Sequence, residues 1–522
     1  MRFSIVMPTR NRANLLARSL KTALAQTGDD YEIVVSNNCC EDHTDRVVQE
    51  LAHPRLRCVR TERVLPMHEH WDFALRQARG EYVTFLCDDD GLHPRALEIT
   101  RRIIDRNRPD LLAWNFAIYT HPHWPDALRR NTLKAGLYTN QVRRVAAARA
   151  LRSAFDLRFP SPFTLPLMLN SLCRRAALER IVAGAGTLFP PTSPDFSSMA
   201  LMLSAVDEYL WLDAPLMLSG TAPEGIGATE PANGQAFRTY IDELGGAPAW
   251  ARHVPLRQQT SLNNIADSLL RARQLAPALA GYDLNWPAYF AQCRCMLEQR
   301  DRHQGDTAAD WQEFHAAVSD RGPDFETRIG AALRDLRTVP APTEHPAIEP
   351  VFDALPAPLF VPPARGEQAG FRNLADCAAL LEDWLPARSL DPQRFVDAVL
   401  DALAQRPQVR RVVLYGLGRF GGHVWHALEP WLTPRGVSLC YVDDQVSNPD
   451  DPRAGALPPR AEWEQGLIVV TPWEDDAIRR RLESLRGERG RHFITWRDVA
   501  TGRADGFGRR SSPSTTVAHR RT

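Results

Sequence analysis

Lysine is nearly absent from this sequence of 522 residues, which has only two lysines among its 63 basic residues. The 63 acidic residues balance the basic ones, so the formal net charge at pH 7 is zero. A chain without net positive charge has no overall field that would attract nucleic acid or an anionic membrane. We therefore expect no nucleic-acid partner, and we attach no functional meaning to the preference for arginine.

The nine cysteines include no Cys-x-x-Cys pair, and their number is odd. This pattern favours free thiols in a reducing compartment over a disulfide framework or a structural zinc site. Long apolar runs are also missing, since none reaches the roughly 18 residues that a membrane-spanning helix needs. The sequence enters a strand-like run, Phe3 to Met7, without a signal-like segment before it. We expect a soluble, cytoplasmic protein without a transmembrane segment.

The composition is that of a globular protein, with 44% hydrophobic and 24% charged residues. These fractions exclude wholesale disorder, collagen-like repeats and a coiled coil. A chain of this length is expected to form about three domains. The local pattern must therefore show what each domain is.

The first 115 residues alternate between short apolar runs and segments with helical periodicity. Strands are predicted at Phe3 to Met7, at Tyr31 to Ser36 and at 81–86, and a helix follows the first strand with leucines at 15, 16 and 20 on one face. This order is typical of a parallel sheet that is covered by helices. The fold class predicted for this region is therefore α/β.

Three consecutive carboxylates, Asp88, Asp89 and Asp90, follow the third of these strands. Open α/β sheets bind their ligands at the carboxyl ends of strands, and neighbouring carboxylates repel one another unless a cation or solvent offsets their charge. Mn²⁺ or Mg²⁺ bound here would also hold the phosphate oxygens of a nucleotide. The triplet alone is equally compatible with a solvated acidic turn in which Gly91 and Pro94 are ordinary loop formers.

Three motifs in order make the N-terminal region resemble the family 2 glycosyltransferases of the GT-A fold. They are SIVMPTRNR, YEIVVSNNCCEDHT and HEHWDFALRQARGEYVTFLCDDDGLHP. The resemblance implies an inverting, divalent-metal-dependent transferase that moves a sugar from a nucleoside-diphosphate sugar to an acceptor hydroxyl. The acceptor, whether glycan, lipid-linked or protein, stays open, and the family expectation is bacterial surface-glycan or polysaccharide synthesis.

The resemblance also implies roles for residues near the first and third motifs. Asp88 would face the ribose, and Asp89 would bind the metal, with Asp90 as the alternative ligand. Cys87 stands where many members have the first Asp of an Asp-x-Asp motif. The ribose and metal contacts are therefore assigned to Asp88 and Asp89, which follow it. The loop after the first strand would contact the nucleotide through Thr9, Arg10, Asn11 and Arg12.

Two further positions are implied by the resemblance. Asn37 and Asn38 stand where members usually have an Asp that contacts the base, so an altered base preference is expected; simple turn chemistry explains the two asparagines equally well. Asp195 follows Asp90 by 105 residues and resembles the general base that takes the proton of the acceptor hydroxyl. Asp195 also precedes a helical run, so it could be an N-cap instead.

The remainder of the chain divides by composition. We predict a GT-A domain over 1–230, a helical region over 231–339, a proline-rich linker with helices over 340–405, a Rossmann-like α/β domain over 406–500 and a disordered tail over 501–522. The linker prediction rests on eight prolines between 340 and 363. Asp391 and Pro392 are predicted to open a helix as N-cap and first residue.

A second glycine motif, GLGRFG, follows the apolar strand RVVLY. Its glycines Gly416, Gly418 and Gly421, with Asp443 after a later strand, fit a dinucleotide site such as one for NAD(P). The same glycines could serve only the packing of a helix on a strand. Besides a transferase, the chain could thus be a nucleotide-binding scaffold or sensor without turnover, or a bifunctional protein whose C-terminal domain binds NAD(P).

Overall fold

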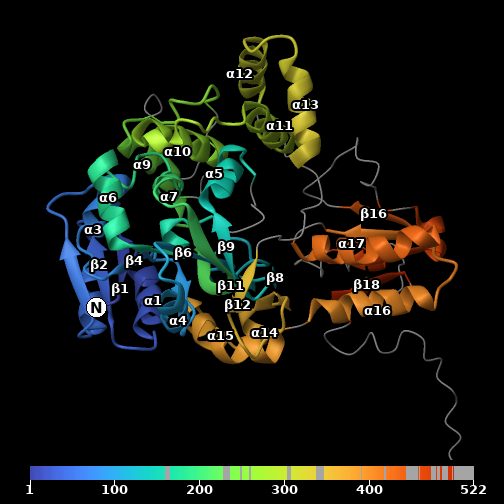
Figure 1. The fold of residues 1–522 in the computed structure, drawn as a ribbon, viewed down its shortest axis with the longest axis horizontal. Coiled ribbons are helices and arrows are strands. Elements are labelled where there is room, and N and C mark those ends of the chain that lie inside the picture. Colours follow the sequence, from blue (N-terminus) through green and yellow to red (C-terminus); the bar gives the residue numbers. More distant parts are fainter. Residues whose placement is uncertain are drawn as a thin grey trace, which may run out of the picture. The chain divides into compact units, whose positions relative to one another are not determined.

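The chain folds into two compact units (Figure 1). The first comprises 1–338, 343–357 and 361–389, and the second comprises 339–342, 358–360 and 390–522. The computed structural model describes residues 1–158, 165–226, 235–246, 250–257, 260–302, 307–336, 346–361, 363–389, 391–416, 419–442, 457, 459–471, 478, 482–484, 492–496 and 498. Within these ranges, each helix is either too short or too polar to cross a membrane.

A 12-stranded mixed sheet forms the centre of the first unit. Its main path runs β12-β9-β11-β6-β10-β4-β1-β2-β3, and β5, β7 and β14 join it at the side. The strands are β1 (Phe3–Thr9), β2 (Tyr31–Asn37), β3 (Leu56–Arg60), β4 (Tyr82–Phe85), β5 (Gly91–Leu92), β6 (Leu111–Thr120), β7 (Thr132–Lys134), β9 (Gln141–Ala146), β10 (Ser171–Arg174), β11 (Glu208–Thr221), β12 (Ala347–Pro350) and β14 (Ala364–Arg365). The predicted α/β class with a sheet rich in parallel strands is confirmed.

Five strands of this sheet end at the same edge. β1 pairs in parallel with β2 and with β4, in a register that places Thr9 opposite Asn37. β10 is antiparallel to both β4 and β6, so β6 runs in the direction of β4, and β11 is parallel to β6. The residues that follow β1, β2, β4, β6 and β11 therefore meet at one carboxyl edge.

Helices cover both faces of the sheet because side chains along each strand point alternately to opposite faces. Phe3, Ile5 and Met7 of β1 join one buried cluster, whereas Val6 belongs to another. The first cluster is completed by α1 (Ala13–Leu24), α2 (Thr44–Glu50) and α4 (Ala96–Asn107). The other is completed by α3 (Met67–Leu75), α5 (Ala147–Phe155), α6 (Arg175–Ala185) and α7 (Pro194–Ser204).

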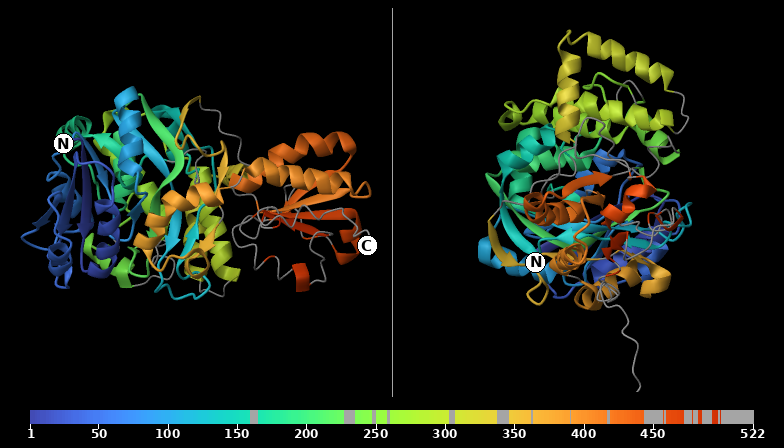
Figure 2. Two further views of the ribbon diagram at one scale, coloured as in Figure 1. Left: turned by 90° about the horizontal axis from the view of Figure 1, so that it is seen from below. Right: turned by 90° about the vertical axis from the view of Figure 1, so that its right-hand side faces the viewer.

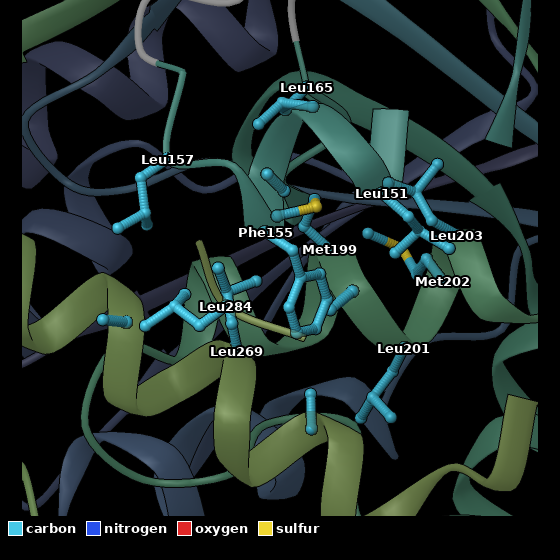
Figure 3. Packing of buried hydrophobic residues seen from close by; sticks show 14 of the residues in the cluster. Leu151, Phe155, Leu157, Leu165, Met199, Leu201, Met202, Leu203, Leu269 and Leu284 are labelled. Carbon is cyan, nitrogen blue, oxygen red and sulfur yellow. The ribbon is translucent and has the colours of Figure 1, made fainter. Parts of the chain in front are cut away.

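A layer of helices extends the second cluster. Leu269 of α10 lies in the same buried group as Phe155 of α5 and Met199 of α7 (Figure 3). The described residues between 235 and 336 form helices and no strand. The helices are α9 (Gln235–Glu243), α10 (Ser261–Leu275), α11 (Trp286–Arg302), α12 (Ala308–Ser319) and α13 (Phe325–Leu336).

The chain between 346 and 389 differs from the extended linker that its prolines predict, because most of it packs onto the first unit. Strand β12 adds to the sheet edge beside β9, and Val351 after it is only 1% exposed. The Asn140 side chain donates to the carbonyl oxygen of Phe352 at 3.0 Å. Beyond them come α14 (Gly366–Ala369) and α15 (Leu374–Arg388), and α15 packs against α1.

The second unit contains a four-stranded parallel sheet in the order β16-β15-β17-β18. Helices α16 (Pro392–Ala404) and α17 (Arg419–Leu432) lie side by side against it (Figure 2). Asp391 is the N-cap of α16, with its carboxylate accepting from the Gln393 amide at 2.9 Å, so this predicted start is confirmed. The strands are β15 (Arg411–Tyr415), β16 (Ser438–Val442), β17 (Gly466–Val470) and β18 (Phe493–Thr495).

Candidate functional site

The loops after β1 and β4 meet at the carboxyl edge of the sheet. The Thr9 hydroxyl donates to Oδ2 of Asp88 at 2.7 Å, and the Arg12 guanidinium donates to Oδ1 of the same carboxylate at 2.5 Å. Arg12 also lies 3.6 Å from a carboxylate oxygen of Asp89. Residues from two motifs that are far apart in the sequence are thus in direct contact.

Asp89 and Asp90 form a second group with Cys87. The Cys87 sulfur and one oxygen from each carboxylate lie within 4.8 Å of one another. Asp90 is oriented by the backbone amide of Gly220 in β11, which donates to its Oδ1 at 2.8 Å. The close turn is held by the Asp90 amide, which donates to the Cys87 carbonyl oxygen at 3.1 Å.

Negative charge is poorly compensated in this group. Burial raises the pKa of Asp90 well above its usual range, and the charge of Asp89 adds to the effect. Burial also raises the pKa of Asp88 and of Asp89, although Arg12 opposes both shifts. Burial would lower the pKa of Arg12, but the charges of Asp88 and Asp89 outweigh it and raise that pKa. One arginine does not neutralise three carboxylates, so the donor set fits a divalent cation.

Residues after β6 and β11 complete this edge, and the sequence motifs did not select them. His121 donates from Nε2 to the Asp89 carbonyl oxygen at 2.9 Å, and burial lowers its pKa to about 4. His123 pairs with Glu224 at 2.8 Å. Gly220 lies so close to the Asp89 backbone that an added Cβ would stand 1.7 Å from its carbonyl oxygen. In the sequence, only their position at the ends of apolar strands could have indicated these residues. His121 lies about 30 residues beyond the acidic triplet, and Gly220 lies about 130 residues beyond it.

The remaining residues of the loop after β1 shape the backbone and connect it to a helix. Asn11 adopts a left-handed conformation with φ of 54°, and its side-chain oxygen accepts from the Glu41 amide at 2.8 Å. Arg10 forms an ion pair with Glu243 at the end of α9. Tyr240, one turn earlier on α9, donates to the carbonyl oxygen of Thr192. Helix α9 thus contacts both this loop and the segment that precedes Asp195.

The side-chain amides of Asn37 and Asn38, at the end of β2, each donate and accept a hydrogen bond within the protein. Asn37 donates to Asp45 at 2.7 Å and accepts from the Cys40 amide at 2.7 Å. Asn38 donates to the carbonyl oxygen of Leu65 at 2.8 Å and accepts from the amide of that residue at 2.9 Å. The contact between Asn37 and Cys40 is of the turn type, whereas Asn38 joins the end of β2 to a segment 27 residues later.

Asp195 lies in the first turn of α7, where Ser193 is the N-cap and Pro194 the first helical residue. Asp195 is therefore not the N-cap but the second helical residue, within the first turn. One of its carboxylate oxygens accepts from the Ser193 hydroxyl at 2.7 Å and from the Phe196 amide at 2.9 Å. Burial raises the pKa of Asp195 in spite of both hydrogen bonds. Within the described residues, no hydrogen bond or ion pair joins Asp195 to the acidic triplet.

The C-terminal glycine motif is described only in part, because Gly418 and Asp443 lie outside the described residues. Gly416 follows β15 with φ of +93°, a conformation that favours glycine. An added Cβ on Gly421 would stand 2.0 Å from the Gly416 carbonyl oxygen, which also accepts from the Thr471 hydroxyl at 2.8 Å. Close packing of helix on strand accounts for these two glycines, and dinucleotide binding stays a prediction.

The parallel-rich sheet gathers an arginine and three aspartates at its carboxyl edge, which is where open α/β sheets bind their ligands. Residues 4–159 match the family model Glycosyl transferase family 2. This part of the chain therefore matches glycosyltransferase family 2, the family that its three motifs predicted.

Curated relatives match only a short part of this chain. The succinoglycan biosynthesis protein ExoO of Rhizobium meliloti is 31% identical over 103 residues, which make up 20% of this chain and 29% of that protein. The GalNAc(5)-diNAcBac-PP-undecaprenol beta-1,3-glucosyltransferase of Campylobacter jejuni is 36% identical over 99 residues, 18% of this chain and 32% of that one. The chain thus spans less than a third of either relative.

Solved structures show a weaker similarity over a longer stretch. Staphylococcus aureus TarS 1-349 in complex with UDP-GlcNAc is 16% identical with a TM-score of 0.36, over 64% of this chain and 90% of that one.

Proposed function

We propose that this protein is an inverting, divalent-metal-dependent glycosyltransferase that moves a sugar from a nucleoside-diphosphate sugar to an acceptor hydroxyl. The observation that carries the proposal is the carboxyl-edge cluster, in which Arg12, Asp88, Asp89 and Asp90 gather inside a family 2 domain. In this proposal the carboxylates would accept from the ribose and ligate a cation, and Arg12 would donate to the diphosphate.

The metal would be Mn²⁺ or Mg²⁺, held by Asp89 and Asp90 with Cys87 beside them. When bound, such an ion neutralises the charge that develops on the diphosphate leaving group. Arg12, which spans Asp88 and Asp89, would add a fixed positive charge for the phosphates. Thr9 holds Asp88 from the other side and would keep that carboxylate aligned for the ribose hydroxyls.

Asp195 would act as the general base. Its carboxylate takes the proton of the acceptor hydroxyl while that oxygen bonds to the anomeric carbon and the bond from this carbon to the diphosphate oxygen breaks. Attack opposite to the leaving group inverts the anomeric configuration. Burial raises the pKa of Asp195, which makes the carboxylate a stronger base than an exposed one.

The donor's base and the acceptor are the open parts of the proposal. Because Asn37 and Asn38 are occupied by backbone and side-chain partners, base recognition would depend on other groups or on a rearrangement of this turn. The Campylobacter relative is named for transfer to an undecaprenol-linked glycan and the Rhizobium relative for succinoglycan biosynthesis. We infer that the acceptor belongs to bacterial surface-glycan or polysaccharide synthesis.

Calorimetric titration tests the proposed donor site. UDP, GDP, CDP and ADP would each be titrated into the full chain with Mn²⁺ and again with EDTA, using wild type, Asp89→Ala and, as a control, Asp105→Ala on the exposed side of α4. We expect one diphosphate to bind only with metal, and only to wild type and the control. Binding that ignores both metal and Asp89, or no binding at all, would reject the proposal. Metal-dependent binding of a diphosphate, combined with neither transfer nor hydrolysis of the corresponding nucleotide sugar in a separate assay, would favour a nucleotide-binding scaffold.

A further inference from the structure

A buried carboxylate outside the proposed donor site holds the segment that presents Asp195. Asp267 of α10 is 0% exposed, and it accepts hydrogen bonds from three residues. The Thr192 hydroxyl donates to its Oδ2 at 2.7 Å and Arg271 Nε at 2.5 Å. His253 donates to its Oδ1 through the backbone amide at 2.9 Å and through Nδ1 at 2.8 Å. All its strong acceptor positions are thus used within the protein.

The segment that Asp267 holds is strained. Thr192 has φ of 91°, a conformation that β-branched residues rarely adopt and that persists only where the surroundings enforce it. Three hydrogen bonds enforce this conformation. The Thr192 hydroxyl donates to Asp267, and the Thr192 carbonyl oxygen accepts from the Tyr240 hydroxyl. The Ser193 amide donates to the Ser268 hydroxyl at 2.8 Å. Two adjacent residues of α10 therefore anchor two adjacent residues of the chain.

The anchored segment leads directly to Asp195. Ser193 is the N-cap of α7, and its hydroxyl donates to the Asp195 carboxylate at 2.7 Å. Behind the first turn, Met199 of α7 packs in the same buried cluster as Phe155 and Leu269 (Figure 3). The helix axis is therefore fixed by apolar packing, whereas the position of its first turn depends on the polar contacts of Thr192 and Ser193.

We propose that Asp267 is a positioning residue for sugar transfer, which holds Thr192, the neighbour of the N-cap Ser193, so that the Asp195 carboxylate stays in its reactive place. This inference rests on the proposed function. A buried aspartate serves this purpose better than an apolar side chain would, because its carboxylate accepts from the Thr192 hydroxyl while Arg271 and His253 hold it in place. Arg271, which is 11% exposed, balances the charge and allows the carboxylate to stay ionised inside the helical layer.

The sharpest variant is Thr192→Val, which removes one hydroxyl, keeps the side-chain shape and leaves Asp267 with Arg271 and His253. Thr192→Ser retains the hydroxyl and should restore function. The matched control is Asn263→Ala in the same helix: this buried amide donates to the Leu256 carbonyl oxygen at 2.9 Å and makes none of the contacts described for the segment. The control separates loss of stability in the helical layer from loss of positioning.

Two readouts would be measured on the full chain with Mn²⁺. The first is hydrogen exchange of the backbone amides in 193–198, all except Pro194, which has no N–H. The second is release of nucleoside diphosphate from UDP-glucose, UDP-N-acetylglucosamine or GDP-mannose. We expect Thr192→Val to speed exchange at 193–198 and to lower kcat about ten-fold to a hundred-fold, the usual cost of a misplaced catalytic group, with KM for the donor within about two-fold. Thr192→Ser and Asn263→Ala should keep kcat near the wild-type value.

The outcomes that overturn the inference are distinct from those that overturn the proposed function. If wild type releases diphosphate and Thr192→Val keeps the wild-type kcat, the positioning role is wrong whatever the exchange shows. A fall in kcat that Asn263→Ala reproduces would assign the effect to general destabilisation and also reject it. If wild type releases no diphosphate from any of the three donors, the proposed function fails and the positioning role fails with it.

Discussion

Substituting alanine for Gly220 is predicted to disable the cation site without touching any ligand. The added Cβ would lie 1.7 Å from the Asp89 carbonyl oxygen and 3.0 Å from Nε2 of His121, where ordinary contacts begin at 3.4 Å. The Asp89 backbone must therefore move away by more than about 1 Å. A shift of that size at a reactive site typically lowers the reaction rate about a hundred-fold. Asp90 would also lose its alignment with the Gly220 amide.

The assay is calorimetric titration of the cognate nucleoside diphosphate with Mn²⁺ present. We expect Gly220→Ala to weaken metal-dependent binding at least ten-fold, with a loss of stability of about 1 to 3 kcal/mol from overpacking. Gly184→Ala in α6 is the matched control, since an added Cβ there meets nothing within 4 Å. It should leave binding unchanged and stabilise the helix by roughly 0.5 to 1 kcal/mol.

Unchanged affinity in Gly220→Ala would refute the reasoning, because it would mean that the Asp89 backbone has no fixed place in the bound state. Equal losses of affinity in Gly220→Ala and Gly184→Ala would also refute the reasoning, because an added Cβ on Gly184 meets nothing within 4 Å.

Three further predictions concern the same machinery. Asp195→Asn should retain diphosphate binding by calorimetry, and in a thermal melt at pH 7 it should be more stable than wild type. The sign follows because burial raises the pKa of Asp195 in the folded protein above its value in the unfolded chain. Wild type therefore loses stability as the pH rises from the unfolded-state pKa of Asp195 through its folded-state pKa. The transfer rate should fall as pH drops through the same raised pKa. Arg12→Gln should weaken diphosphate binding by about ten-fold in the same titration. Cys87→Ser should reduce binding of Co²⁺ or Cd²⁺ more than that of Mg²⁺, because sulfur selects softer metals; equal losses would exclude the thiol as a ligand.

Local sequence and the family resemblance together predicted the part of the site that lies in the motifs. Apolar strands followed by polar residues indicated where the sheet edge would be, and the resemblance singled out Thr9, Arg12 and Asp88, which are in contact there. Parallel pairing explains why this succeeded: strands that run in the same direction bring the residues after them to one edge.

Residues that act across long stretches of sequence were not predictable in this way. Gly220 contacts Asp90 across 130 residues, and Asp267 contacts Thr192 across 75. Neither carries a motif, since a glycine in a strand and an aspartate in a helix are common. Asp42 was missed for a related reason: its carboxylate accepts from the Ala13 amide at 2.8 Å and so supports the start of a helix 29 residues earlier. Their roles come from tertiary packing, which sequence periodicity does not encode.

The most direct test of the central claim is the anomeric configuration of the sugar in the first product. Proton NMR would follow the full chain with Mn²⁺ and the nucleotide sugar that it accepts, using wild type and Asp195→Asn. The account predicts an initial product of inverted configuration from wild type and at least a hundred-fold slower formation by the variant, the lower end of the contribution expected from general base catalysis. A product of retained configuration, or wild-type turnover by Asp195→Asn, would contradict it.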